Sequence, residues 1–393
     1  MRQRRWACRG LMLCAALGCG GALALAQSSA PNAGKAEASQ DMLSRKEVTG
    51  IIADSRKIVT SNGVEALLTV PVNGENQWLS IRGRDRRNPI LLVLHGGPGS
   101  PTMPADYTFQ SPWEDYFTVV EWDQRGAGKT YASNDTKALA STLTVEQMTS
   151  DAEVVVRYLM KTYGKKKIFL LGHSWGSVLG VELAQRHPEW FYAYLGVGQV
   201  VNMQKSERIG YEFALQQAKE HGNSEAVKEL MAIAPYPGPE GSVTFARIGV
   251  QRKWLMYYGG LTWGRKDYDY DSNARELSPD YTQKDIDETD KGGLASVTHL
   301  LPALMAIDFD SVDTFKCPVF LFDGRHDYAT SHELAVGWFK KIKAPEKEFV
   351  WFDHSSHMAM QEEPGRFLYY MVRDMRPLAV ATGDMTPDNE VLH

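Results

Sequence analysis

The stretch Ile168-Phe169-Leu170-Leu171-Gly172-His173-Ser174-Trp175-Gly176 decides the predicted fold. Its first four residues are continuously apolar, which indicates a strand buried on both faces. The pattern G-x-S-x-G follows, and a helical pattern continues from Val178 to Arg186. A strand, a sharp glycine-containing turn and a helix together predict that Ser174 lies at the carboxyl edge of a sheet as a candidate nucleophile.

Similar apolar runs recur on both sides of this stretch. They predict strands at Ile90 to Leu94, Phe117 to Trp122, Val319 to Phe322 and Phe349 to Phe352. Helical patterns separate them: a Thr-x-x-Gln capping pattern at Thr144 begins a helix that continues to about Tyr163, and another helix is expected from about Ser331 to Ile342. Strands that alternate with helices predict an α/β protein with a mainly parallel sheet and helices on both faces.

The interval from about 200 to 310 breaks this alternation. It holds a helical pattern from Lys205 to His221, a Pro/Gly break at 235–238 and an aromatic cluster that includes Trp254 and Tyr258. A separate domain would explain this interval, but strands of the same character resume after it. A mainly helical cap inserted over the sheet fits better.

Two later loops supply partners for a serine nucleophile. A histidine must take the proton of Ser174, and a carboxylate must orient that histidine. We favour Asp327 over Asp323, because the later residue lies beyond the glycine turn and has a loop with which to reach the histidine. We favour His357 over His354 because it lies further along its loop. The order Ser174, Asp327, His357 is the order expected when the nucleophile follows a strand-turn-helix elbow.

The strand Ile90 to Leu94 is followed by His95-Gly96-Gly97-Pro98-Gly99. A loop of small residues lets backbone N–H groups approach a substrate, and an oxyanion needs two such donors. We assign them to Gly97, or alternatively Gly96, and to Trp175.

Several other classes of function are excluded. A formal charge of −5 gives no basic surface for nucleic acid. The segment Gly126 to Thr130 imitates a phosphate-binding loop, but Asp123 stands where that motif needs glycine. His326, His354 and His357 lack further ligands at metal-site spacing, so neither a metal nor another cofactor is expected. A serine at the elbow excludes hydrolases that use a carboxylate nucleophile.

Five motifs together identify a resemblance. HGGPG (95–99), WDQRGAGKT (122–130), GHSWGS (172–177), DGRHD (323–327) and HMAMQEEP (357–364) resemble the α/β-hydrolase superfamily, in its proline iminopeptidase (prolyl aminopeptidase, peptidase S33) branch. The resemblance runs in order from about Gly63 to Arg373. It implies an α/β-hydrolase fold with a helical cap, and release of an N-terminal residue, typically proline, from peptides. An esterase or other acyl hydrolase with the same triad is the alternative, so the expected partner is a small peptide or ester.

The resemblance also implies that cap glutamates beside aromatic residues hold the substrate amino group. Glu207 and Glu212 are the candidates by position, although a solvated helix face is the common explanation for such residues. Trp254 and Tyr258 are candidates for lining the acyl pocket. Equally, they could pack the cap onto the body.

The N-terminus has the features of an export signal. Four arginines precede an apolar stretch, 10–26, that ends in Ala24-Leu25-Ala26, which predicts a signal peptide cleaved after Ala26 and a periplasmic or secreted enzyme. A retained anchor and a lipoprotein site at Cys19 are the alternatives. Cleavage removes four arginines and no acidic residue, so the net charge changes from −5 to −9, and Cys317 is the one cysteine left.

The predicted organisation of the chain follows from these segments. It comprises a signal peptide (1–26), a flexible segment (27–44), the two parts of the body (45–199 and 311–376) with the cap (200–310) between them, and a C-terminal tail (377–393).

Overall fold

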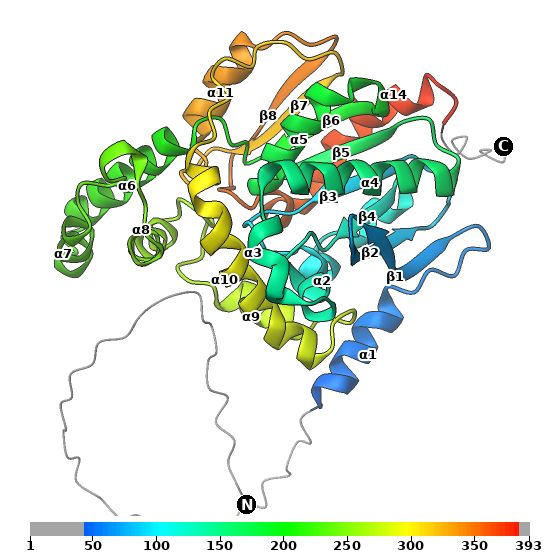
Figure 1. Cartoon of the computed structure of the whole chain (residues 1–393), viewed down its shortest axis with the longest axis horizontal. Helices are drawn as coiled ribbons and strands as arrows, with labels where there is room; N and C mark the ends of the chain where they lie inside the picture. Colours follow the sequence, from blue (N-terminus) through cyan, green and yellow to red (C-terminus); the bar gives the residue numbers. More distant parts are fainter. Residues whose placement is uncertain (1–42, 385–393) are drawn as a thin grey trace, which may run out of the picture.

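The computed structural model describes residues 43–384, in which eight strands form one sheet in the order β1-β2-β4-β3-β5-β6-β7-β8 (Figure 1). The strands are β1 (Val64–Val72), β2 (Glu75–Gly83), β3 (Ile90–Leu94), β4 (Thr118–Trp122), β5 (Ile168–His173), β6 (Phe191–Val197), β7 (Val319–Gly324) and β8 (Lys347–Phe352). Strands β3 to β8 pair in parallel, whereas β1 and β2 form an antiparallel hairpin at one edge.

Burial accounts for four of the five predicted strands, β3, β4, β5 and β7, but β6 is equally buried and is not among the predicted strands. Strands β3 to β7 are buried along their whole length, because helices cover both faces of the sheet there. Strand β1 at the edge instead alternates between exposed and half-buried residues over most of its length, and no continuous apolar run marks it. The predicted α/β architecture, with a mostly parallel sheet between helices, is confirmed.

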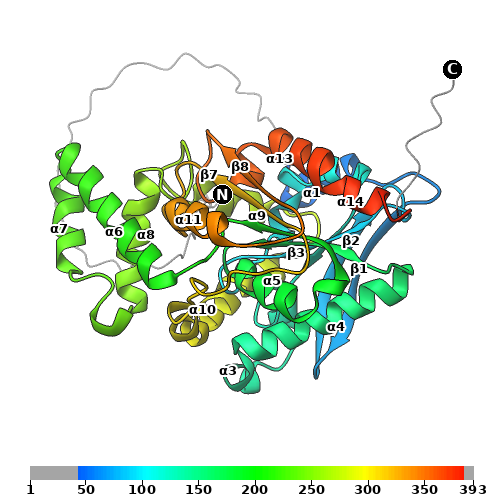
Figure 2. The same cartoon turned by 90° about the horizontal axis from the view of Figure 1, so that it is seen from above.

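Two helical layers sandwich the sheet (Figure 2). Helices α4, α5 and α11 pack on one face, around a core that includes Val155, Leu179 and Trp338. Helices α12 to α14 and a 3-10 turn pack on the other face, around Trp113 and Phe367. The helices are α1 (Arg45–Ser55), α2 (Gly128–Ser133), α3 (Leu139–Thr142), α4 (Val145–Tyr163), α5 (Trp175–Arg186), α6 (Met203–Glu220), α7 (Ser224–Ala232), α8 (Phe245–Tyr257), α9 (Asp269–Glu276), α10 (Gln283–Met305), α11 (His332–Lys341), α12 (Ala359–Glu362), α13 (Pro364–Tyr370) and α14 (Arg376–Val380).

Helices α6 to α10 lie between β6 and β7 in the chain and fall into two groups. Helices α6, α7 and α8 pack on one another around a small core of their own, which contains Tyr211, Leu230 and Trp254, and they extend to one side of the sheet (Figure 1). Helices α9 and α10 instead contact the body, α10 against α2 and α9 against the turn Met103–Thr108. The inserted segment therefore has an outer part and a part attached to the body.

The structure describes part of the predicted C-terminal tail but none of the predicted signal peptide. The predicted signal peptide and nearly all of the flexible segment that follows it lie outside the described residues. At the other end, the predicted tail begins inside α14, where Ala379 is buried and Lys165 forms an ion pair with Asp384 at 2.6 Å. Within residues 43–384, no helix is long and apolar enough to cross a membrane.

Candidate active site

Ser174 lies on a strained turn between β5 and α5. Its backbone has φ 53° and ψ −120°, which is rare for a residue with a side chain. The turn needs glycine on both sides: a Cβ at Gly172 would lie 2.6 Å from the carbonyl oxygen of Gly176, and one at Gly176 would lie 1.9 Å from that of Leu94. The Ser174 N–H donates to the carbonyl of Val197 at 2.9 Å. The surroundings thus fix the strained conformation and direct the serine out of the sheet edge.

Asp327 and His357 meet beyond the ends of β7 and β8. The Nδ1 atom of His357 lies 2.7 Å from Oδ2 of Asp327. Asp327 is fully buried and also accepts hydrogen bonds from the N–H groups of Ala329 and Thr330 and from the Thr330 hydroxyl. Burial alone would raise the pKa of Asp327, but His357 and these donors outweigh it and lower the pKa to about 2. The carboxylate is therefore charged at neutral pH.

A second histidine fixes the loop that carries His357. Nε2 of His173, the residue before Ser174, lies 3.0 Å from the carbonyl oxygen of His357. Burial, with a smaller contribution from His357, lowers the pKa of His173 to about 3, so its ring is neutral. The ring therefore donates its N–H to that carbonyl, which ties the His357 loop to the serine turn.

The glycine-rich loop after β3 faces the same space. Gly97 has φ +113°, a conformation that favours glycine. Trp175 is the first residue of α5, so its N–H has no partner within the helix. Gly96, Gly97, Ser174 and Trp175 all line one cavity with His357. The two predicted oxyanion donors and two of the three predicted triad residues thus line one cavity, and Asp327 reaches it through its hydrogen bond to His357.

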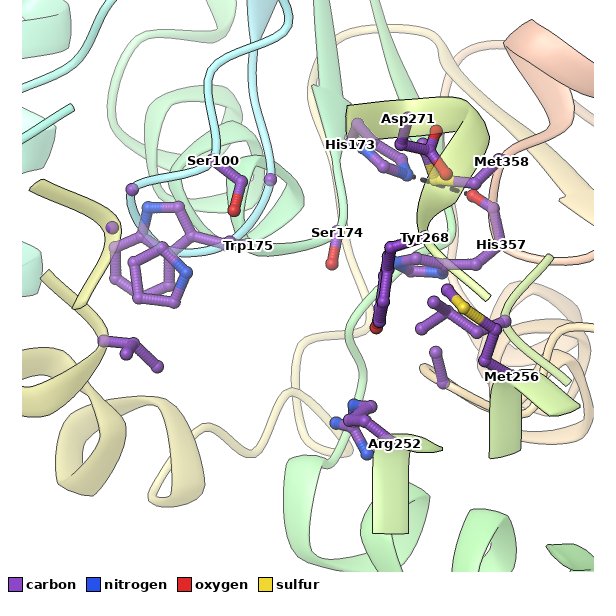
Figure 3. Close-up of a pocket in the computed structure, with 18 of the residues that line it drawn as sticks. Ser100, His173, Ser174, Trp175, Arg252, Met256, Tyr268, Asp271, His357 and Met358 are labelled. Atoms are coloured by element: carbon purple, nitrogen blue, oxygen red, sulfur yellow. Dashed lines mark hydrogen bonds between the residues drawn. The ribbon is translucent and has the colours of Figure 1, made fainter. Parts of the chain in front are cut away.

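This cavity, of about 690 Å³, lies between the sheet edge and the inserted helices (Figure 3). Ser174 and His357 point into it from the body. The opposite wall comes from α8, α9 and α10, and α10 contributes the apolar residues Leu294, Val297, Leu301 and Leu304. Their spacing of three and four positions places them on one face of the helix. A volume of this size suits a small organic molecule or a short peptide.

The structure places none of the four predicted substrate-binding residues on the cavity wall. Glu207 is buried, but inside the cap, where it pairs with Arg252 and accepts a hydrogen bond from Tyr236. Glu212 is exposed on α6. Trp254 and Tyr258 belong to or border the small core of the cap, and the Trp254 ring N–H donates to Glu229. Packing inside the cap therefore explains the aromatic residues, and an ion pair explains Glu207.

Sequence reasoning misses the cap residues that do line the cavity. Arg252 reaches it from α8 while pairing with Glu207. Asp271 reaches it from α9, and its Oδ2 atom is buried without a hydrogen-bond partner. Burial raises the pKa of Asp271, although Arg265 and Arg275 oppose the shift. The run 266–271 is acidic and rich in tyrosine, a composition typical of a solvated surface, so only the fold reveals that one of its carboxylates lines the cavity with Ser174.

The alternative acid and histidines also have clear positions. Asp323 is buried and its Oδ1 atom has no hydrogen-bond partner, whereas Asp327 is the carboxylate that bonds to His357. His354 is exposed, and the ring of His326 stacks on Trp263 with centroids 3.5 Å apart. Among the described residues, no group of three or more His, Cys, Asp and Glu side chains could hold a metal ion.

Comparison with known proteins identifies the protein family to which this chain is similar. Residues 90–364 match the sequence profile of the family described as serine aminopeptidase, S33. The chain is 30% identical to a "Probable aminopeptidase YbaC" of Bacillus subtilis over 321 residues, which cover 81% of this chain and 99% of that protein. It is 37% identical to a proline iminopeptidase of Neisseria gonorrhoeae over 99 residues, which cover 25% of this chain and 29% of that protein.

Comparison with solved structures confirms the predicted α/β-hydrolase fold. A proline iminopeptidase-related protein of Thermus thermophilus superposes with a TM-score of 0.56 at 20% identity, covering 81% of this chain and 98% of that one. A proline iminopeptidase of Mycobacterium smegmatis superposes with a TM-score of 0.55 at 17% identity, covering 81% of this chain and all of that one.

Proposed function

Because this chain belongs to the serine aminopeptidase S33 family of α/β-hydrolases, we propose that it removes the N-terminal residue, preferably proline, from short peptides. The observation that carries the proposal is the arrangement of an ionised Asp327 bound to His357 beside a strained, cavity-facing Ser174. The full-length relative named as an aminopeptidase supports the reaction class. The preference for proline rests on the partial relatives named as proline iminopeptidases.

The proposed reaction proceeds through an acyl-enzyme. His357 accepts the proton of the Ser174 hydroxyl while the oxygen attacks the scissile carbonyl. Asp327 holds the Nδ1–H of His357 and stabilises the imidazolium that forms. The N–H groups of Gly97 and Trp175 donate to the oxyanion. His357 then gives its proton to the leaving amine, and a water molecule, deprotonated by the same histidine, releases the acyl group from Ser174.

Asp271 is the group that we propose for recognition of the substrate amino group. It lies on the same cavity as Ser174 and His357, and its buried Oδ2 has an unused acceptor position. A substrate ammonium would supply the missing donor together with an opposite charge, and such charge-assisted hydrogen bonds are the stronger kind. Asp271 pairs with Arg265 only through Oδ1, at 3.7 Å. Glu212 is exposed, and both oxygens of Glu207 already accept hydrogen bonds from Arg252 and Tyr236.

An esterase or other acyl hydrolase is the second candidate. The apolar face that α10 presents to the cavity, with Leu294, Val297 and Leu301, would suit an acyl chain as well as a peptide side chain. The same triad would serve both reactions, so the substrate amino group is what separates the two candidates.

A comparison of matched substrates tests the choice. We expect kcat/KM for proline 4-nitroanilide to exceed that for its N-acetylated form by at least about 100-fold, because blocking the amine leaves Asp271 without its partner. Short 4-nitrophenyl esters measure the acyl hydrolase activity in parallel. Equal turnover of the blocked and unblocked anilides, with faster turnover of the esters, would favour the esterase.

We also propose that the enzyme is exported and cleaved after Ala26, as its basic and apolar N-terminal segment predicts. N-terminal sequencing of the mature protein is expected to begin at Gln27. A mature chain that begins at Met1 would contradict export by this route.

A further inference from the structure

The cap loop, residues 259–263 between α8 and α9, bonds to both of the later triad loops. Three successive carbonyl oxygens of this loop accept hydrogen bonds from the body. The pairs are the Ser356 hydroxyl to Gly259 at 2.5 Å, the N–H of Tyr328 to Gly260 at 2.9 Å, and the N–H of His357 to Leu261 at 3.1 Å. Because Tyr328 directly follows Asp327, the cap loop contacts the chain beside the acid as well as at the histidine.

Glu362, the last residue of α12, adds a side-chain bridge to this contact. Its Oε1 accepts the N–H of Trp263, in the cap loop, at 2.6 Å, and its Oε2 accepts the N–H of Ser356, in the His357 loop, at 2.7 Å. Arg265 lies 3.6 Å from Oε1. Burial raises the pKa of Glu362, whereas the two N–H donors and Arg265 oppose that shift by stabilising the charged form. One oxygen therefore binds the cap and the other binds the body.

The backbone around His357 is held at three points. Its carbonyl bonds to the serine turn through His173, its own N–H bonds to the cap loop, and the residue before it bonds to Glu362. The imidazole must stay within reach of both the acid and the nucleophile, and small displacements of reacting groups lower rates strongly. Two of the three restraints depend on the cap loop, so docking of the cap bears directly on the position of the histidine.

We propose that Glu362 is a positioning residue of the triad: its carboxylate joins the cap loop to the His357 loop and so holds the imidazole in line with Asp327 and Ser174. The inference rests on the proposed roles of those three residues and extends them to a side chain outside the cavity. Since Glu362 does not line the cavity, it acts through the histidine and not on the substrate. The cap then has two tasks, to form the wall opposite the serine and to complete the support of the histidine.

Glu362→Gln weakens this bridge with little change in shape. An amide has one oxygen, so one of the two N–H groups would face an NH2 group instead of an acceptor. Glu363→Gln is the matched control, because Oε1 of Glu363 alone accepts both of its hydrogen bonds, from the His354 N–H at 2.9 Å and the Ser355 hydroxyl at 3.0 Å, and neither donor belongs to the cap. A glutamine oxygen can keep both bonds, and the two variants remove the same charge from adjacent positions.

Labelling by a fluorophosphonate reports how well the histidine activates Ser174 and requires no substrate amine. We expect Glu362→Gln to lower the second-order rate constant for labelling about tenfold, and Glu363→Gln to stay within about twofold of the parent chain. A side chain that only stabilised the fold would lower the free energy of unfolding and leave the rate constant of the folded enzyme unchanged. Denaturant unfolding of each variant separates the two effects.

Turnover of proline 4-nitroanilide gives a second readout for the same variants. In Glu362→Gln, kcat should fall by about the same factor as the labelling rate, whereas KM should change less than about threefold. The proposed amine site is held separately, because Asp271 lies on α9, which the hydroxyl of Tyr107 fixes to the body by a hydrogen bond to the carbonyl of Ala274 at 2.9 Å.

Ser356→Ala tests the contact between the two loops without altering Glu362. It removes the hydroxyl that lies 2.5 Å from the carbonyl oxygens of Gly259 and His326, and it keeps the N–H that bonds to Glu362. Labelling should slow about threefold, because one of several bonds between the loops is lost.

Labelling of folded Glu362→Gln at the parental rate would overturn the proposal, whatever its free energy of unfolding. Equal slowing in Glu363→Gln would overturn it as well, since contact with the cap would then make no difference. If Glu362→Gln does not fold, parental labelling of Ser356→Ala has the same consequence. Failure of the aminopeptidase proposal would instead appear as equal hydrolysis of blocked and unblocked anilides, which leaves the labelling result intact.

Discussion

The body and the cap build their parts of the cavity in different ways. In the body, Ser174, Asp327 and His357 each follow a parallel strand, and the carboxyl ends of such strands meet at one edge of the sheet. In the cap, Asp271 and Arg252 come from separate helices, and only tertiary packing brings them to the cavity. The proposed catalytic groups on the body are therefore positioned by topology, whereas the proposed binding groups on the cap are positioned by how the helices dock.

The largest effect is expected from replacing the proposed nucleophile on the body. Ser174→Ala should lower kcat by roughly 10⁴-fold or more, because it removes the nucleophile and leaves only the binding groups. The free energy of unfolding should change little, since alanine and serine meet the same strain at φ 53°. Activity assays with denaturant unfolding check both statements. Turnover close to that of the wild type would contradict the assignment.

The next largest effect is expected from adding a side chain to the tightly packed serine turn. Gly176→Ala places a Cβ 1.9 Å from the carbonyl oxygen of Leu94 and should lower the free energy of unfolding by about 3 kcal/mol or more. Gly337→Ala is the control, because its Cβ meets nothing within 4 Å inside α11 and should stabilise the chain by about 0.5–1 kcal/mol. Equal effects in urea titrations would show that close packing does not shape the turn.

The cap side is tested by two glutamates on α6. Glu207→Ala leaves Arg252 without its buried partner and should destabilise the cap by about 2–3 kcal/mol, whereas the exposed Glu212→Ala should stay within about 0.5 kcal/mol. Hydrogen exchange should show faster exchange in α6, α7 and α8 for Glu207→Ala, with β5 still protected. Uniform loss of protection would mean that cap and body unfold as one unit.

Substrate recognition is expected to give a smaller effect. Asp271→Asn should raise KM for proline 4-nitroanilide about tenfold, because the amide lacks the charge that pairs with the ammonium. KM for the N-acetylated form should not change. Asp269→Asn, on the same helix but not on the cavity, is the matched control. If both variants behave alike, another group binds the amine.

The pH dependence of KM follows from the same carboxylate. Burial raises the pKa of Asp271, so the group takes up a proton at a higher pH than an ordinary aspartate and loses its charge as the pH falls. KM for the unblocked anilide should therefore rise towards acid pH, and this rise should be absent for the blocked anilide and in Asp271→Asn. A parallel rise for both substrates would assign the effect to another group.

The comparison also explains what the sequence could predict. The strand runs and the loops after them predict the elbow, the acid and the histidine. The strands before the elbow and the acid are fully buried and leave a continuous apolar pattern, and the strand before the histidine keeps an apolar run although it is only partly buried. The start of α4 after Thr144 is likewise predicted, since its side chain caps the helix at the N–H of Gln147. Strands β1, β2 and β6 escape detection. Strand β1 lies at the sheet edge and is partly exposed, whereas β6 is fully buried, so burial alone does not make a strand predictable.

The cap could not be predicted to the same depth. Trp254 and Tyr258 are aromatic residues of the kind that often line substrate pockets, but they pack within or beside the core of the cap. Asp271 lies in a segment with the composition of solvated surface, and contact with the body turns it towards the cavity. Local sequence patterns do not show how the cap docks on the body, so such cavity residues can be identified only from the structure.

Covalent labelling tests the central claim, that His357 and Asp327 activate Ser174, most directly. The purified enzyme is treated with a fluorophosphonate, and the modified peptide is identified by mass spectrometry. We predict a single adduct on Ser174, with labelling at least about 100-fold slower in His357→Ala. An adduct on another serine, or equal labelling rates with and without His357, would contradict the account.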